Sequence, residues 1–318
     1  MGRYLGIDTS NYTTSCALID TDSGEHISLK RLLPVAGGER GLRQSDAVFH
    51  HTKQLPELME ELFCGDGGKA GAGLSAVGCS YAPREVEGSY MPCFLVGEGS
   101  ARITAAAEGI PLYRTSHQKG HVLAALFGCG RLDLIHGDRG FLAFHVSGGT
   151  TDLLLCEPDK DRVISVTELG RSLDLKAGQC IDRIGVSLGL GFPAGRALDE
   201  LSKGSGRSFK IRPSVRGMSC SLSGVENKCR DMIRAGEKAE DIAAFCLGYI
   251  YESIRAMTRA AVAEYGELPI VYAGGVMANS MMKRELGREF GGLFAPPELS
   301  SDNALGVAVY AAAMEGRI

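Results

Sequence analysis

Two apolar runs joined by a short polar turn make up the stretch Phe141-Leu142-Ala143-Phe144-His145-Val146-Ser147-Gly148-Gly149-Thr150-Thr151-Asp152-Leu153-Leu154-Leu155. Apolar runs on both sides of a Gly-Gly pair predict a β-hairpin. The turn residues lack a Cβ at two positions and carry hydroxyls at three, so bare backbone N–H groups and O–H donors can converge on an anion. The turn is therefore either a phosphate cradle or a plain hairpin turn.

A second stretch near the N-terminus repeats this pattern. Residues 3–8 read as a strand, residues 9–14 as a hydroxyl-rich turn and residues 15–19 as a return strand. Each hairpin carries an aspartate beside its turn, Asp8 before the first turn and Asp152 after the second. Two such hairpins predict two related α/β lobes, each presenting a polar turn to a shared cleft. The arrangement resembles that of actin, the sugar kinases (hexokinase) and the chaperone ATPases, and it makes Asp8 and Ser10 candidate nucleotide contacts.

Size, charge and cysteine content limit the class of protein. A chain of 318 residues with 44% apolar residues can bury a core as one large or two medium domains. The net charge of −4 offers no global attraction for nucleic acid, so such a partner needs a local basic patch. The ten cysteines contain no C-x-x-C pair, which favours free thiols in a reducing compartment. With no membrane-length apolar run and no signal peptide, we expect a cytoplasmic protein.

The helix expected from Ala47 to Leu62 carries an apolar stripe opposite a charged face. That stripe is either core or the docking face of a partner, which could be a paralogous subunit or a second copy. The long irregular segment Ala82–Pro92 is either a functional loop or a surface excursion.

Two histidines begin another expected helix. Ser116 is a natural N-cap, and a helix that starts there places His117 and His121 one turn apart on one face. Two imidazoles at this spacing can bind a divalent metal such as zinc or iron, although the pair can also be purely structural. No glutamate follows His117, which disfavours a metallopeptidase. Asp302 is either the cap of the last helix or a third, anionic ligand.

Three later features are candidate ligand contacts. Asp182 either meets ribose hydroxyls or is a solvated helix residue. The segment Lys203–Arg216 holds five cations and no acidic residue, so it either contacts a tRNA backbone or is a solvated loop. The buried strand that precedes Gly274, Gly275 and Asn279 leads into a helix, a plausible shelf for adenine or ribose.

The order and spacing of several motifs resemble those of the tRNA threonylcarbamoyladenosine synthase family, formerly called the O-sialoglycoprotein endopeptidases. The motifs are GIDTSNYTTS, HQKGH, VSGGTTDL, AGQCIDR, FPAG, SGVENK, AGGVMAN and SDNALG. The resemblance implies an actin- and hexokinase-like, ribonuclease H-like fold with lobes 1–136 and 137–301, and with residues 302–318 packing back on the first lobe. It implies transfer of a threonylcarbamoyl group from its adenylate to the N6 amine of the adenosine beside the tRNA anticodon.

The same resemblance assigns site residues. His117, His121 and Asp302 look like ligands of one divalent metal (Fe, Zn or Mg), and an adenylate or ATP-type nucleotide is implied. The acyl-adenylate phosphate would meet the loop of Val146, Ser147, Gly148, Gly149 and Thr150. The nucleoside contacts would be Asp182, Gly195, Asp199 and Asn279.

The sequence also departs from the family pattern. Tyr12 and Thr13 replace an acidic pair, Lys119 replaces the glutamate of H-x-E-G-H, and Gln179 replaces the glutamate of A-G-E. Thr150 stands where a histidine is usual, and Ala82–Pro92 replaces a short Gly-Pro-Gly loop. Lys119 could compete for an anionic metal ligand or recruit it. Three functions follow: the tRNA transferase, a related carbamoyl transferase with another acceptor, or a non-catalytic nucleotide-binding partner subunit.

Overall fold

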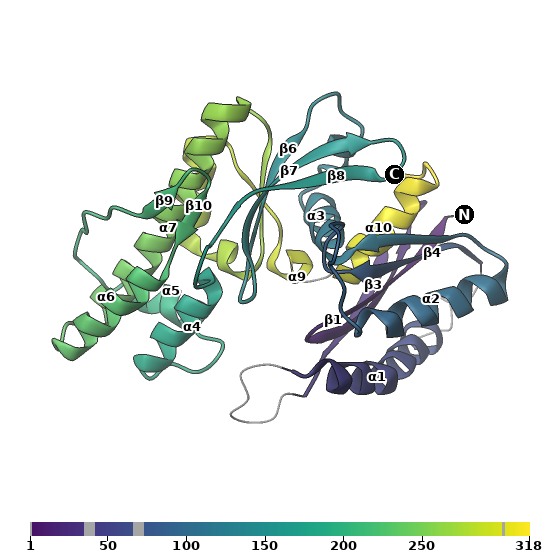
Figure 1. Ribbon diagram of the computed structural model, residues 1–318, viewed down its shortest axis with the longest axis horizontal. Coiled ribbons are helices and arrows are strands. Elements are labelled where there is room, and N and C mark those ends of the chain that lie inside the picture. The colour runs from purple at the N-terminus through teal and green to yellow at the C-terminus, as the bar shows by residue number, and fades with distance from the viewer. Residues whose placement is uncertain (1, 35–41, 66–72, 301–302) are drawn as a thin grey trace. The chain divides into compact units, whose positions relative to one another are not determined.

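The chain divides into two compact units (Figure 1). The computed structural model describes residues 2–34, 42–65, 73–300 and 303–318. The first unit comprises Met1–His136, Asp159–Ile164 and Glu298–Ile318, and the second comprises Gly137–Pro158 and Ser165–Pro297. The boundaries expected from the sequence, after residues 136 and 301, differ from these at residues 159–164 and 298–301.

The first unit is built on a five-stranded sheet in the order β3-β2-β1-β4-β5. The strands are β1 (Arg3–Ser10), β2 (Thr13–Asp20), β3 (His26–Leu32), β4 (Leu74–Ala82) and β5 (Leu112–Ser116). The turn between β1 and β2 is shorter than expected, because Thr9 pairs with Thr14 and Ser10 with Thr13. Threonine is β-branched and suits a strand, so the hydroxyl-rich segment extends the ladder instead of forming a six-residue turn.

Helices cover both faces of this sheet (Figure 1). They are α1 (Gln44–Cys64), α2 (Phe94–Glu108), α3 (His117–Gly128), the short η2 (Leu132–Ile135) and α10 (Asn303–Met314). Leu5 and Ile7 of β1 pack with Leu55 and Leu58 of α1. On the other face a Cβ at Gly6 would lie 2.0 Å from the carbonyl oxygen of Ala304. Glycine therefore lets α10 lie directly on the strands.

The second unit repeats the sheet order of the first. Its strands are β6 (Phe141–Val146), β7 (Thr151–Asp159), β8 (Val163–Arg171), β11 (Ile270–Ala273) and β12 (Leu293–Phe294), in the order β12-β11-β6-β7-β8. The predicted hairpin is confirmed, because Val146 pairs with Thr151 in antiparallel register. In both units the central strand has an antiparallel neighbour on one side and a parallel one on the other. The expected internal duplication is therefore visible in the sheets.

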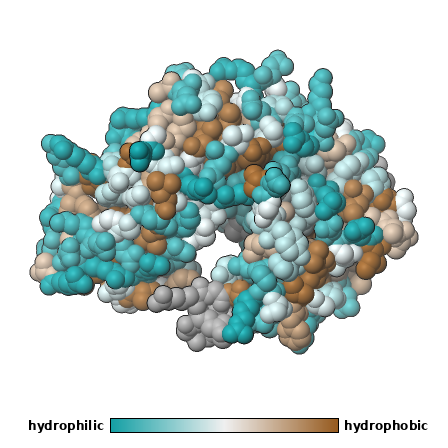
Figure 2. Space-filling model, in the orientation of Figure 1, coloured by the Kyte–Doolittle hydropathy of each residue, from teal (hydrophilic) through white to brown (hydrophobic). Residues whose placement is uncertain are grey.

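Helices surround the second sheet, together with a small two-stranded hairpin. They are α4 (Ala177–Ser187), α5 (Gly195–Ser202), α6 (Ser223–Arg234), α7 (Ala239–Tyr265), η3 (Gly275–Ala278) and α8 (Ser280–Phe290), and the hairpin is β9 (Ser214–Arg216) with β10 (Ser219–Ser221). The short α9 (Pro297–Ser300) spans the boundary at which the chain returns to the first unit. The long helix expected for packing is α7, which buries Ile250, Ile254 and Met257 in the core. The surface over α6 is largely hydrophilic (Figure 2).

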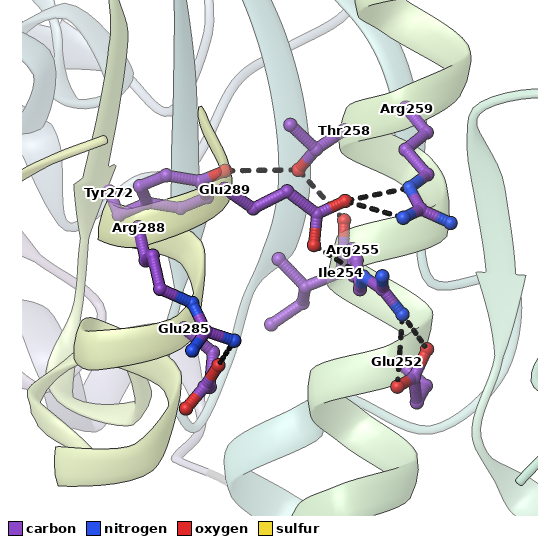
Figure 3. Close-up of polar contacts among 9 residues, drawn as sticks. All are labelled: Glu252, Ile254, Arg255, Thr258, Arg259, Tyr272, Glu285, Arg288 and Glu289. Atoms are coloured by element: carbon purple, nitrogen blue, oxygen red, sulfur yellow. Dashed lines mark hydrogen bonds and ion pairs between the residues drawn. The ribbon is translucent and has the colours of Figure 1, made fainter. Parts of the chain in front are cut away.

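An ionic network ties α7 to α8 in this unit (Figure 3). The carboxylate of Glu289 accepts from Arg255 Nε at 2.6 Å and from Arg259 Nε at 2.7 Å. Thr258 precedes Arg259 in the same helix, and its hydroxyl lies 3.0 Å from that of Tyr272, which connects α7 to β11. All three charged side chains are partly exposed, so the network is a surface clamp between two helices.

The cysteines form no disulfide in the described structure. Eight of the ten cysteines are buried, and all ten have free thiols. Among the helices that the structure describes, none combines the length and apolarity needed to cross a bilayer.

Candidate functional site

The two predicted metal-binding histidines face each other on α3. The helix begins at His117 because the Ser116 side chain accepts a hydrogen bond from the Lys119 backbone N–H at 3.3 Å. The Nε2 atoms of His117 and His121 lie 3.0 Å apart. Two nitrogens about 2.1 Å from one ion lie close to this separation when they are adjacent ligands. The geometry of the pair therefore fits a metal site.

A buried carboxylate supports the first of these rings. Asp8 Oδ1 accepts from His117 Nδ1 at 3.0 Å, from Asn303 Nδ2 at 2.7 Å and from the Ser80 hydroxyl. The bond from Nδ1 leaves the Nε2 lone pair of His117 directed at His121, as a metal ligand requires. Burial alone would raise the pKa of Asp8, but the charge and hydrogen bonds of His117 and Ser80 outweigh it and lower the pKa.

Two buried oxygens at this cluster have no hydrogen-bond partner among the described residues. They are Asp8 Oδ2 and Asn303 Oδ1. An orphaned buried acceptor is costly, and a bound cation or water would satisfy it. Asn303 follows Asp302, the predicted third ligand, which lies outside the described residues. Within the described part of the chain no group of three or more His, Cys, Asp or Glu side chains forms a metal-binding set.

Lys119 does not approach the histidine pair as a free cation. Its ammonium pairs with Glu85 Oε2 at 2.8 Å and donates to the Arg162 carbonyl oxygen at 3.2 Å. Burial lowers the pKa of Lys119, and the Glu85 carboxylate opposes that shift. Competition for an anionic ligand and recruitment of one were both expected from its place in the sequence. The structure instead gives its charge a partner from the segment Ala82–Pro92.

The first polar turn uses its hydroxyls internally. Thr9 Oγ1 donates to the Cys93 carbonyl oxygen at 2.9 Å, and Thr14 Oγ1 lies 2.8 Å from His51 Nδ1. His51 Nε2 lies 2.8 Å from the Ser10 carbonyl oxygen. Burial lowers the pKa of His51, which favours the uncharged form of the ring. The turn is thus anchored to α1, while Asp8, grouped with it in the sequence, contacts His117.

The second polar turn is preformed against a helix N-terminus. Ser147 Oγ accepts from the backbone N–H groups of Gly149 and Thr150, and the Ser147 carbonyl oxygen accepts from Gly178 N at 3.1 Å. A Cβ at Gly178 would lie 2.7 Å from the backbone of Gly148, so glycine lets α4 approach the turn. Turn N–H groups beside a helix N-terminus favour a phosphate.

The candidate nucleoside contacts of the second unit lie in linked pairs. Asp182 Oδ1 accepts from the Ala194 N–H at 2.8 Å, which fixes the chain just before Gly195. Asp199 Oδ1 accepts from Asn279 Nδ2 at 2.8 Å. Asn279 also caps α8, since its side chain accepts from Met282 N. The structure therefore joins Asp199 to Asn279 and Asp182 to the segment that begins α5.

Gly274 brings the predicted shelf close to the second turn. Its φ is +96°, and a Cβ there would lie 2.2 Å from the carbonyl oxygen of Val146. Only glycine fits this approach. Gly275 then begins η3, which leads to Asn279. The end of β11 therefore lies beside the end of β6.

The basic segment Lys203–Arg216 is partly neutralised. Lys203 pairs with Glu200 at 2.6 Å, and Arg207 pairs with Glu237 at 2.5 Å. The remaining three cations, Lys210, Arg212 and Arg216, are exposed and make no ion pair with any described residue. An unexpected hairpin, β9 and β10, presents Arg216.

The apolar stripe of α1, the helix predicted to bind a partner, packs in the core of its own unit. Leu55, Leu58 and Leu62 of α1 belong to the core of the first unit. Among the described residues, Phe49 of α1 and Leu95 and Ile103 of α2 are exposed apolar side chains. Figure 2 shows hydrophobic patches over these two helices.

Sequence reasoning missed three residues at the histidine pair. Ser80 lies near the end of β4, which runs parallel to β1 with Ile7 opposite Cys79, so Asp8 and Ser80 lie side by side in neighbouring strands. That rule could have paired them from the predicted strands. Asn303 and Glu85 carry no comparable signal, because each reaches the site by tertiary packing.

Comparisons with known proteins place the chain among tRNA-modifying enzymes. The profile of a family described as tRNA N6-adenosine threonylcarbamoyltransferase matches residues 39–309. A protein of that name from Methanopyrus kandleri is 27% identical over 310 residues, which cover 96% of this chain and 85% of the relative.

Two solved structures share the fold. HypF from T. kodakarensis superposes with a TM-score of 0.61 at 13% identity, over 99% of this chain and 48% of that one. Component A of the (R)-2-hydroxyglutaryl-CoA dehydratase of Acidaminococcus fermentans gives a TM-score of 0.53 at 16% identity, over 100% and 99%. At this identity the likeness shows the fold alone, which is the expected actin- and hexokinase-like α/β type.

Proposed function

Because the chain belongs to the tRNA N6-adenosine threonylcarbamoyltransferase family, we propose that it transfers a threonylcarbamoyl group from threonylcarbamoyl-adenylate to the N6 amine of the adenosine beside the tRNA anticodon. The amine nitrogen bonds to the carbonyl carbon and loses a proton. The bond from that carbon to the phosphate oxygen breaks, and AMP leaves with the electron pair. The observation that carries the proposal is the facing pair His117 and His121 above the buried Asp8.

The proposed metal centre consists of His117, His121 and Asp302. Imidazole ligands suit zinc or iron better than magnesium, so the histidine pair favours those two ions. A bound cation supplies positive charge that stabilises the departing AMP phosphate. Asp8 orients His117, because the hydrogen bond from Nδ1 holds the ring in the tautomer whose Nε2 is free to bind a metal.

The proposed adenylate site lies in the second unit. Its phosphate would accept from the N–H groups of the turn 146–150, where Ser147 Oγ now occupies two of them, beside the N-terminus of α4. The carboxylates of Asp182 and Asp199 suit ribose hydroxyls, and Asn279 orients Asp199. Close approach of the ligand is eased at Gly195, Gly274 and Gly275, which lack side chains. In the first unit Ser10 remains a candidate contact.

The acceptor tRNA would bind the exposed cations Lys210, Arg212 and Arg216. Each phosphate contact releases counterions, so affinity should fall steeply with salt. Replacing all three by glutamine should weaken tRNA binding and flatten its salt dependence. Lys203→Gln is the matched control, because that cation is already paired with Glu200.

We propose the outer surface of α1 and α2 for a protein partner, either a paralogous subunit or a second copy. The exposed Phe49, Leu95 and Ile103 carry this proposal, not the buried stripe of α1. Sedimentation of the wild type and of Leu95→Glu would test self-association.

The deciding experiment incubates the purified protein with threonylcarbamoyl-adenylate, Zn²⁺ or Fe²⁺ and unmodified tRNA, followed by nucleoside analysis. Threonylcarbamoyladenosine should form and should be absent with His117→Ala. A complete lack of the modified nucleoside with metal supplied contradicts the proposal.

A related carbamoyl transferase with a small-molecule acceptor is the second candidate. The exposed Tyr12 favours it, because it and Thr13 stand where the family has an acidic pair. Product analysis without tRNA separates the two activities. Nucleotide binding without turnover on any acceptor would instead indicate a non-catalytic subunit.

A further inference from the structure

The segment from Pro83 to Pro92 follows β4 and docks on the first turn of α3. The Gln118 backbone N–H donates to the Pro83 carbonyl oxygen at 3.0 Å. Two residues further on, Glu85 Oε2 lies 2.8 Å from Lys119 Nζ. Gln118 and Lys119 directly follow His117 in the chain. The segment is therefore attached to the two residues that follow the first histidine.

Lys119 is buried, with a side chain only 1% exposed. An unpaired ammonium at this depth would be strongly unfavourable, so the position depends on its acceptors. Besides Glu85 it donates to the Arg162 carbonyl oxygen at 3.2 Å and lies 5.8 Å from the centre of the Tyr310 ring. Lys119 thus connects α3, α10, the segment 83–92 and the 159–164 tip within the first unit.

At its other end the segment leads into α2, whose first residue contacts His117. Phe94, the first residue of α2, meets the His117 ring edge to face at a centroid distance of 6.1 Å. The preceding residue, Cys93, accepts from Thr9 Oγ1 through its carbonyl oxygen and donates through its N–H to Gln44. The segment is therefore fixed at both ends, with His117 in contact with one of them.

From these contacts we propose that Glu85 and Lys119 are positioning residues for His117. Their ion pair holds the segment 83–92 against α3, and this keeps the His117 ring on the Asp8 carboxylate with Nε2 directed at His121. The inference rests on the metal centre of the proposed function. Neither side chain takes part in the reaction.

The test compares Glu85→Gln, Lys119→Met and the double variant Lys119→Met/Glu85→Met with the wild type. Each single variant leaves one buried polar group without its partner, whereas the double variant replaces the pair by apolar chains of similar length. Glu98→Gln is the matched control. Glu98, on α2 in the same unit, pairs with Arg114 at 3.0 Å, and the arginine of that pair is half exposed.

Two readouts apply, at a temperature where every variant is folded. Titration with Co²⁺ alone, followed by its visible absorption, should show at least tenfold weaker binding in both single variants. The double variant should return to within threefold of the wild type. In nitrogen-15 spectra of the metal-free protein, the His117 Nδ1–H signal should persist in the wild type, the double variant and Glu98→Gln, and should broaden or vanish in the single variants.

Each result decides one of the two ideas. Single variants with a lower melting temperature but unchanged Co²⁺ affinity and an unchanged His117 signal would overturn the positioning role. A double variant as impaired as the single ones would do the same. If the wild type binds no Co²⁺, the metal centre of the proposed function fails, and the His117 signal alone then decides whether the ion pair positions the ring.

Discussion

Charged side chains form two very different networks in this protein. Around α3, Asp8 and Lys119 are almost completely buried, and Asp8 Oδ2 has no partner among the described residues. Between α7 and α8, Glu289, Arg255 and Arg259 are partly exposed, and both carboxylate oxygens of Glu289 are used (Figure 3). Burying charges is costly, whereas a solvated clamp costs and contributes little. The costly network indicates function, and the inexpensive one indicates packing.

The substitution His121→Ala, in the buried network, should have the largest effect. Loss of one of three ligands should reduce metal affinity by more than about 100-fold and abolish transfer, because two donors hold a divalent ion poorly. Metal analysis of protein purified without chelators, together with the tRNA assay, measures both. His136→Ala is the control, since the Nε2 atom of that ring lies 2.7 Å from the Ile318 carbonyl oxygen and takes no part in the histidine pair. Unchanged metal content in His121→Ala would refute the site.

Gly306→Ala should lower the stability of the protein strongly. A Cβ there would lie 1.8 Å from the Gly120 carbonyl oxygen, so α3 and α10 would have to separate. We expect a loss of about 3 kcal/mol in the free energy of unfolding, measured by urea denaturation. In contrast, Gly99→Ala in α2 faces open space and should stabilise the protein by about 0.5–1 kcal/mol. Equal effects of the two changes would contradict the tight crossing.

Asp8→Asn should weaken metal binding by about 10- to 100-fold while the chain stays folded. The amide can no longer act as a charged acceptor for His117 Nδ1–H, which orients the ring. Competition with a chromophoric chelator gives the affinity. Asp133→Asn, which breaks only a surface pair with Arg131, should leave the affinity unchanged. An unaffected Asp8→Asn would separate the carboxylate from the metal site.

Glu289→Gln should change little. The pair with Arg255 and Arg259 is partly exposed, and we expect a loss below about 1 kcal/mol in urea denaturation. Burial alone would raise the pKa of Glu289, and the two arginines lower it. Metal affinity and transfer should match the wild type. A large functional defect would remove the distinction between the two networks.

The smallest expected effect is a pH slope in the first unit. Burial lowers the pKa of His51, so the unfolded chain takes up a proton before the folded one as the pH falls. Stability from this group is complete above about pH 6.5 and is lost as the pH falls from there towards the lowered folded pKa. Urea midpoints measured from pH 8 to 5 should decline less in His51→Gln than in the wild type. An identical slope would show that His51 is not the group responsible.

Local patterns predicted the elements of the fold well. The hairpin around Gly148, the Ser116 cap and the long helix α7 all follow from turn chemistry, capping and periodicity, which act over a few residues. The first turn was predicted too long, because the ladder between β1 and β2 favours paired threonines. The hairpin β9–β10 was not anticipated, because each of its strands has only three residues. The helix α6 was also not anticipated, although Val225, Cys229 and Met232 recur at helical spacing on its buried face.

Spacing along one helix sufficed to predict that two of the candidate residues lie together. The spacing of His117 and His121 fixes their common face, and the structure brings their Nε2 atoms together. The roles of Ser80, Asn303 and Glu85 depend on contacts between segments far apart in the chain. The ion pair of Lys119 could not be predicted either, because its partner Glu85 lies in an irregular loop whose path has no periodic sequence pattern.

The helix α10 lies directly on β1 and beside α3, although it is synthesised after the entire second unit. Until residues 303–314 leave the ribosome, the strand surface at Gly6 and Gly78 lacks the cover of α10, and Asp8 lacks the amide of Asn303. The surroundings of the histidine pair can therefore be completed only after α10 has been translated. A nascent chain stalled before residue 303 should expose this bare sheet to chaperones and leave Asp8 without one of its hydrogen-bond donors.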